Sequence, residues 1–336
     1  MQFKSVKGFT GWAQLGILLV FIGLGVVLAT GIQMYFGMKA LGLHSIPSTS
    51  DADAMMKAFL KPENATYTQL AQIFGTFFLL FVPSALFIAI CYGKPIWGGF
   101  SKYFTINQIA IGFLIILAAN FFAAPFEEIS KSMFAHFPHL DKLAKDAEKL
   151  YNDEITAMST LNTWPQFFVA VFIIAFLPAL FEEFFFRGVV QNLLVRWLKK
   201  PVLAITITSI IFSLIHASYY LFLSRFVLGY ILGLLFYQSK NIWVNTIAHF
   251  MNNFIAIIQL FVLNTSSKTN TLNADAIDPK LPIWSLLITG AALYYLFNYF
   301  KKISATKKML IVAEENLSLA SSNFYDTTDI NNIGNN

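Results

Sequence analysis

Long apolar runs separated by shorter polar stretches follow one another along most of the chain. Eight runs stand out, at about 12–37, 67–91, 103–124, 166–195, 201–223, 226–239, 242–263 and 283–300. A helix needs roughly 20 apolar residues to cross the hydrocarbon core of a bilayer, and most of these runs reach that length. The pattern predicts an all-α fold, a multi-spanning transmembrane helical bundle of about eight helices, with any active site in an intramembrane cavity.

The polar stretches divide the chain into a membrane part and a tail. Residues 1–308 hold all the apolar runs and are expected to form the transmembrane domain, whereas residues 309–336 are expected to be a polar, disordered tail. The loop 125–165 has apolar residues at the spacing of an amphipathic helix, at Leu140, Leu143, Ala147 and Leu150. Two interpretations of this segment stay open: a surface helix lying over the bundle, or a lid that guides the substrate.

Composition and charge support a membrane location. Hydrophobic residues make up 57% of the chain and charged residues 12%, about half of the roughly 25% found in soluble domains. This composition excludes an ordinary soluble domain, a disordered protein and a coiled coil. The net charge of +5 comes from basic residues at the ends of apolar runs, so no nucleic-acid partner is expected. Their distribution predicts cytoplasmic N and C termini, and we expect a multi-pass protein of a bacterial cytoplasmic membrane.

Five ionisable residues lie inside the apolar runs, namely Glu182, Glu183, Arg187, His216 and His249. A charged group at the centre of a bilayer costs about 2.5–3.5 kcal/mol on insertion scales. These side chains are therefore expected to face one another or a water-filled cavity. Intramembrane ionisable residues are functional candidates by default.

Helical spacing separates the two neighbouring glutamates. Glu183 and Arg187 are four residues apart, so they share a helix face and can pair. Glu182 is turned about 100° away, which makes it the better candidate for a general base. An alternative is that all three residues form one structural ion-pair cluster that pins helices together.

Two further runs add polar groups of complementary chemistry. His249 and Asn253 are four residues apart and share one face, and His216 follows Phe212 at the same spacing. One carboxylate, two imidazoles and an amide can hold and deprotonate a water molecule, and an amide can donate to a developing oxyanion. Zinc is an alternative, because Glu182, His216 and His249 are also a suitable set of metal ligands.

These residues resemble the three motifs of the CPBP intramembrane proteases, which include the type II CAAX prenyl endopeptidases and the bacteriocin-processing and immunity-related proteins of the ABI family. The motifs occur in order as Glu182-Glu183-x-x-x-Arg187, Phe212-x-x-x-His216 and His249-x-x-x-Asn253. The resemblance covers about residues 175–257, within a protease core expected at about 166–263. It implies peptide-bond hydrolysis inside the membrane.

The resemblance also implies roles for individual residues. Glu182 would activate the attacking water with help from His216, while His249 and Asn253 would stabilise the oxyanion. Both a metal-free glutamate mechanism and a zinc mechanism are compatible with the family.

The remaining motif residues would support the site. By the same resemblance, Glu183 and Arg187 would support the catalytic residues without contacting the substrate, and Phe212 would pack against the site. The expected partners are the lipid bilayer and a peptide or protein substrate, for which a prenylated CAAX-type peptide is one option.

Two other function classes stay open from the sequence. A proton-coupled transporter could use Glu182, Arg187, His216 and His249 as a relay, although no inverted repeat is visible. A non-catalytic immunity or scaffold protein could keep the same residues for binding. No HExxH motif, no Asp within an apolar run and no GxSxG-like serine motif is present, which argues against other intramembrane protease types.

Overall fold

The computed structural model describes residues 3–43, 51–158, 163–266 and 281–321, and within these ranges the chain is a helical bundle. The only β-type pairing there is an isolated bridge between Lys4 and Thr10. Six helices or helix runs are long and apolar enough to cross a membrane: Gly11–Leu41, Ala65–Cys91, Ile106–Ala135, Trp164–Leu198, Phe222–Ser239 and Ile242–Val262. The prediction of an all-α, multi-spanning membrane fold is confirmed, with eight as an approximate helix count.

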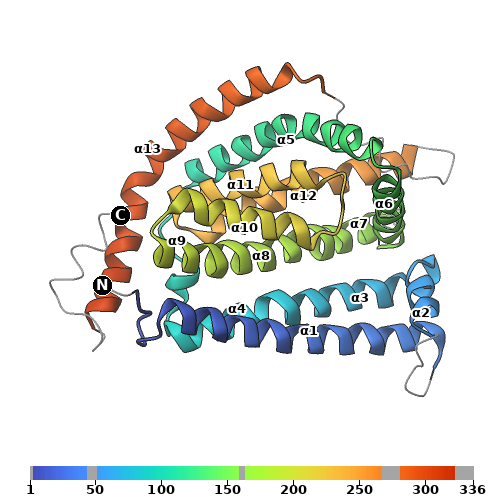
Figure 1. Cartoon of the computed structure of the whole chain (residues 1–336), viewed down its shortest axis with the longest axis horizontal. Coiled ribbons are helices and arrows are strands. Elements are labelled where there is room, and N and C mark those ends of the chain that lie inside the picture. Colours follow the sequence, from blue (N-terminus) through green and yellow to red (C-terminus); the bar gives the residue numbers. More distant parts are fainter. Residues whose placement is uncertain (1–2, 44–50, 159–162, 267–280, 322–336) are drawn as a thin grey trace.

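The chain forms two layers of helices (Figure 1). One layer holds α1 (Gly11–Leu41), α2 (Asp51–Phe59), η1 (Pro62–Asn64), α3 (Ala65–Thr76), η2 (Phe77–Phe81), α4 (Val82–Cys91) and η3 (Pro95–Gly98). The other holds α5 (Ile106–Ala135), α6 (Pro138–Met158), α7 (Trp164–Ala170), η4 (Val171–Phe176), α8 (Leu177–Glu183), η5 (Phe184–Gln191), α9 (Asn192–Leu198), α10 (Pro201–Ile215), α11 (Phe222–Ser239), α12 (Ile242–Ser266) and α13 (Ser285–Ala320). The start of α1 and the end of α13 lie at the same end of the bundle (Figure 1). The side of the membrane that this end faces stays a prediction from the charge distribution.

Two prolines inside long helix runs are accommodated by wider helical turns. Pro83 lies at the start of α4 and follows the π-helical η2, and Pro178 lies at the start of α8 and follows the π-helical η4. Proline lacks the N–H of a regular helix and its ring clashes with the carbonyl one turn earlier. A π-helical turn before each proline adjusts the backbone where the regular bonding is interrupted, so the run Trp164–Leu198 continues through the site as one rod.

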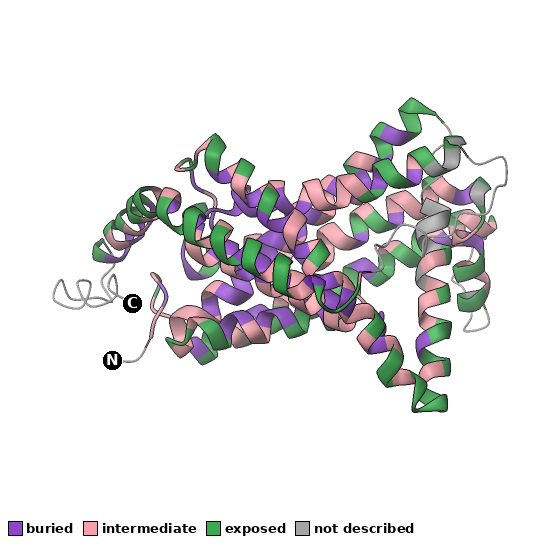
Figure 2. Ribbon diagram, turned by 90° about the horizontal axis from the view of Figure 1, so that it is seen from above, coloured by how far each residue is buried: buried purple, intermediate pink, exposed green. Residues whose placement is uncertain are grey.

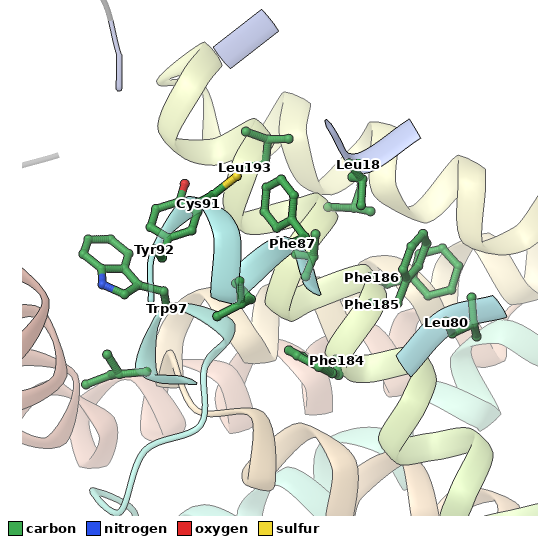
Figure 3. Close-up of a cluster of buried hydrophobic side chains, with 14 of the residues drawn as sticks. Leu18, Leu80, Phe87, Cys91, Tyr92, Trp97, Phe184, Phe185, Phe186 and Leu193 are labelled. Carbon is green, nitrogen blue, oxygen red and sulfur yellow. The ribbon is translucent and has the colours of Figure 1, made fainter. Parts of the chain in front are cut away.

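The largest buried cluster joins the two layers. Phe184, Phe185 and Phe186 of η5 pack with apolar residues of α1, α4 and η3 (Figure 3). A Cβ atom on Gly188 would lie 2.5 Å from the backbone oxygen of Gly98, so glycine allows η5 to approach η3. Buried residues gather in the middle of the bundle, while exposed residues dominate the outer helices (Figure 2). This packing fixes the helix that carries both glutamates.

The helix that begins in the apolar run 201–223 is shorter than that run predicts. Helix α10 ends at Ile215 after 15 residues, about 22 Å, which is less than the roughly 30 Å of a bilayer core. Residues 216–221 form a turn, and α11 begins at Phe222, earlier than the predicted 226. His216 therefore lies at the C-terminal cap of a short helix rather than in the middle of a span.

The prediction of a disordered tail from residue 309 is wrong for residues 309–320. Helix α13 continues to Ala320, and Glu315 is buried between Arg196 of α9 and Lys240 at the end of α11. Ile311 is fully buried on the same helix. Ion pairs with residues far away in the sequence thus order a segment that looked like a polar tail. Residues 322–336 lie outside the described residues.

Helix α6 lies across one end of the bundle, where the two layers meet (Figure 1). The helix expected in the loop 125–165 is present. Of the apolar residues at helical spacing, Leu140 and Leu143 are each 46% exposed, whereas Ala147 and Leu150 are partly buried. Ala144 is fully buried.

Candidate active site

Glu183 is the centre of a buried hydrogen-bond network. Its Oε1 accepts from Arg187 Nη1 at 2.8 Å and from His249 Nδ1 at 2.9 Å, and its Oε2 accepts from Asn245 Nδ2 at 3.1 Å. The Glu183 and Arg187 side chains are 0% and 1% exposed. The predicted pair is therefore present, although the η5 backbone is π-helical rather than α-helical.

Arg187 is held from three sides. Besides Glu183, its Nη2 donates to the backbone oxygen of Gly229 at 3.0 Å, and its guanidinium lies 4.7 Å from the centre of the Phe212 ring. One turn further along η5, Gln191 donates to the backbone oxygen of Gly233 in the same way. The two glycines have no side chain to separate α11 from its neighbours, so side chains of η5 reach the α11 backbone.

Glu182 faces away from Arg187 and toward the two histidines. Its Oε2 lies 3.9 Å from Nε2 of His216 and 3.9 Å from Nε2 of His249. These distances are too long for direct hydrogen bonds. The Glu182 and His216 side chains are 16% and 26% exposed, whereas His249 is 8% exposed. Glu182 is thus the accessible member of the glutamate pair.

The partners of the other ring nitrogens define the tautomer of both histidines. His216 Nδ1 lies 2.7 Å from the backbone oxygen of Phe212, which can only accept, so this nitrogen carries the hydrogen. His249 Nδ1 likewise donates to the Glu183 carboxylate. In the neutral rings both Nε2 atoms therefore carry lone pairs, and both point toward Glu182.

Asn253 does not join this group directly. Its Nδ2 donates to the backbone oxygen of Ala175 at 3.5 Å, and its Oδ1 accepts from Asn252. Asn252 in turn accepts from Asn120 of α5. Among the hydrogen bonds of the described residues, Asn253 has none to Glu182 or to either histidine. Its oxyanion role stays a prediction.

The donors are spaced more widely than the ligands of a bound zinc ion. Bonds of about 2.0–2.1 Å at a tetrahedral ion would bring ligand atoms to about 3.4 Å from one another. The Glu182 oxygen is 3.9 Å from each nitrogen. Within the described part of the chain, no group of three or more His, Cys, Asp or Glu side chains has an arrangement that could hold a metal ion. Both the zinc mechanism and the metal-free mechanism stay predictions from the sequence.

Some residues of the site are not part of the motifs. Asn245 shares the helix face of His249 but bonds to Glu183 and not to a substrate position. Gly229 and Gly233 contribute only their backbone, and the sequence signal for them is a small residue repeated after four positions in an apolar run. Ser218 and Tyr220, which hold the turn after His216, carry no signal that distinguishes them from other loop residues.

Residues 164–255 match the family model described as type II CAAX prenyl endopeptidase Rce1-like. The matched segment begins at α7 and ends within α12, so it contains the helix of both glutamates, the His216 turn and His249. No curated protein and no solved structure matches the chain. The match confirms the resemblance predicted from the three motifs and coincides with the part of the chain that builds the site.

Proposed function

Because residues 164–255 make this chain a member of the CPBP family of intramembrane proteases, we propose that the protein is a multi-pass endopeptidase in which Glu182 activates the water that attacks a peptide bond. The observation that carries this proposal is the position of Glu182. Its carboxylate faces two unprotonated ring nitrogens at 3.9 Å each. Three acceptors that face one another need a donor between them, and a water molecule is the smallest donor that fits.

The geometry suits a water held by Glu182 and His216. Because Glu182 Oε2 and His216 Nε2 are 3.9 Å apart, a water oxygen between them can lie about 2.8 Å from both atoms. The water would donate one hydrogen to Glu182 Oε2 and the other to His216 Nε2. Glu182 takes the proton as the oxygen attacks the carbonyl carbon, and it then gives a proton to the leaving amine.

His249 is suited to the developing negative charge. The Glu183 carboxylate accepts from Nδ1 and so fixes the orientation of the ring, as the aspartate does in a Ser-His-Asp triad. For this role His249 Nε2 takes a proton from solvent when the substrate binds, and the resulting N–H donates to the oxyanion. We propose Asn253 as a second donor, since its present bond to Ala175 is long at 3.5 Å and easily exchanged.

The substrate would be a peptide segment that reaches the site from the bilayer. Prenylated CAAX-type peptides are the class suggested by the matched family model. The match and the site favour neither the transporter nor the non-catalytic alternative. We propose the metal-free form of the mechanism, because the 3.9 Å spacing of the donors suits a bridging water better than a shared zinc ion.

The test is cleavage by purified protein in proteoliposomes. Prenylated and unprenylated CAAX-type peptides would be assayed with and without a chelator, using wild type and Glu182→Gln. A matched control is Glu128→Gln, a half-exposed carboxylate paired only loosely with Lys131 at 3.8 Å. We expect cleavage by wild type and the control and at least a hundredfold loss of kcat in Glu182→Gln, in line with loss of a general base.

Three results would change the proposal. Full activity of Glu182→Gln would refute the glutamate mechanism. Loss of activity on chelation, restored by zinc, would refute the metal-free form. Proton-driven solute uptake without peptide cleavage would refute the enzyme class altogether.

A further inference from the structure

Helix α6 contacts the turn after His216 through a polar face. Asp141, Ala144 and Glu148 are spaced by three and four residues, so they share one side of the helix. Ala144 is fully buried and Asp141 and Glu148 are partly buried, whereas Leu140 and Leu143 are each 46% exposed. The side of α6 that carries Asp141, Ala144 and Glu148 therefore faces the protein.

Two side-chain hydrogen bonds connect this face to the turn. Ser218 Oγ donates to Glu148 Oε2 at 2.7 Å, and Tyr220 Oη donates to a carboxylate oxygen of Asp141. Burial, together with the Asp141 carboxylate, raises the pKa of Tyr220 to about 12, so the phenol keeps its hydrogen at neutral pH. Lys145 pairs with Asp141 at 2.6 Å from the same helix. The contact therefore uses two donors of the turn and two acceptors of α6.

The turn itself needs support from its surroundings. Ala217 has a φ of 50°, in the left-handed region that residues with a Cβ atom rarely adopt. Strained positions of this kind persist only when neighbouring contacts hold them. On one side Arg225 of α11 donates to the backbone oxygen of His216 at 3.2 Å. On the other side the turn is bonded to α6, and the rings of Tyr219 and Tyr220 pack against Phe134 of α5.

We propose that Asp141 and Glu148 are positioning residues for His216, which hold the turn 216–221 so that the His216 ring faces Glu182. The proposal rests on the proposed function, because the position of His216 matters for hydrolysis. Without the α6 bonds, the turn can relax toward ordinary backbone angles. His216 Nε2 would then move away from Glu182, and the water between them would lose one acceptor.

The enzymatic test compares variants that keep or remove the acceptors in the full-length protein. Glu148→Gln keeps an oxygen that can accept from Ser218, and Glu148→Ala does not. Loss of one hydrogen bond corresponds to roughly a two- to tenfold effect. We expect kcat to fall by this factor in Glu148→Ala and Tyr220→Phe, with KM within about twofold of wild type, and to recover in Glu148→Gln. Asp146→Asn is the matched control, an exposed carboxylate on the same helix, and should match wild type.

A second measurement keeps this proposal separate from the proposed function. Hydrogen exchange of the 216–221 amides, read by mass spectrometry, reports the order of the turn even if no peptide is cleaved. We expect faster exchange there in Asp141→Ala/Glu148→Ala than in wild type or Asp146→Asn. Unchanged exchange would overturn the positioning role, whatever the activity. A higher KM at unchanged kcat would overturn it too and would make α6 a substrate-guiding lid.

Discussion

Removal of Glu183 should destabilise the protein far more than removal of its neighbour Glu182. In Glu183→Ala the Arg187 guanidinium stays buried and loses the carboxylate that it bonds at 2.8 Å. The partners that remain among the described residues are the backbone oxygen of Gly229 and the rings of Phe186 and Phe212. In Glu182→Ala no hydrogen bond of comparable length is lost, because the nearest ring nitrogens are 3.9 Å away.

The expected magnitudes differ by several kcal/mol. Breaking a buried ion pair by removing one partner costs about 3–5 kcal/mol, because an uncompensated charge is left behind. At roughly 2 °C per kcal/mol for a larger domain, the unfolding temperature should fall by about 6–10 °C in Glu183→Ala. Substitution of Glu182, whose side chain is 16% exposed, should stay within about 1 kcal/mol of wild type. Activity should be lost in both variants, for different reasons.

The assay is thermal unfolding in one detergent, followed by size-exclusion recovery of the monodisperse protein. A third variant, Glu183→Ala/Arg187→Met, removes both buried charges. It should recover at least half of the stability lost in Glu183→Ala, since replacing a buried ion pair by apolar residues is often neutral or stabilising. Recovery of folding without recovery of cleavage would separate the structural and chemical contributions of this network.

Two outcomes would refute this reasoning. An unfolding temperature of Glu183→Ala within about 2 °C of wild type would mean that the buried charge of Arg187 is satisfied without Glu183. A double variant less stable than the single one would mean that Arg187 stabilises the fold through Gly229 and Phe212 and not through the ion pair.

Two further predictions concern the rest of the bundle. Burial alone would raise the pKa of Glu315, but Arg196 and Lys240 outweigh burial and hold the pKa below its ordinary value of 4.5. The stability that ionised Glu315 contributes is therefore complete above pH 4.5, and it is lost as the pH falls through the lower pKa of the folded state. The unfolding temperatures of wild type and Glu315→Gln should differ most at neutral pH and converge in acid. Burial lowers the pKa of Lys240 to about 8, so Lys240 stays charged over this interval. An equal difference in unfolding temperature at neutral and acid pH would contradict a stabilising role of the ion pairs. Gly188→Ala should lower stability by about 1–3 kcal/mol, because the new Cβ would lie 2.5 Å from a backbone oxygen of η3. Gly16→Ala is its control, with nothing within 4 Å, and should be neutral or slightly stabilising in thermal unfolding.

Local spacing was sufficient to predict how the two glutamates are oriented. An ionisable residue in an apolar run is conspicuous, and helical periodicity separates Glu183, which shares a face with Arg187, from Glu182, which does not. The structure has both features. The π-helical backbone of η5 did not disturb the prediction, because the pair spans a single turn.

Long-range contacts explain what the sequence did not reveal. The apolar run at 201–223 continues through the chain reversal after Ile215, so hydropathy cannot locate the end of α10. Glu315 lies in a polar stretch, and its partners Arg196 and Lys240 are 119 and 75 residues away. The bonds of Asp141 and Glu148 in α6 run to Tyr220 and Ser218, 70 or more residues away, so the helical period of the loop could not reveal them.

The two adjacent glutamates differ in what a proton would do to each of them. Glu183 already accepts three N–H bonds, so protonation would break at least one of them and leave Arg187 without its counter-charge. Glu182 faces two ring nitrogens at 3.9 Å, so a proton on one of its oxygens would reach either nitrogen only through a bridging water molecule. The neighbours of Glu183 therefore engage both of its oxygens in the ion-pair and hydrogen-bond network, whereas those of Glu182 leave its carboxylate free to accept the proton of a water molecule. Exchange of their roles would require a different set of neighbours at each position, which is why substitution of the two residues should give different phenotypes although they are adjacent in the sequence.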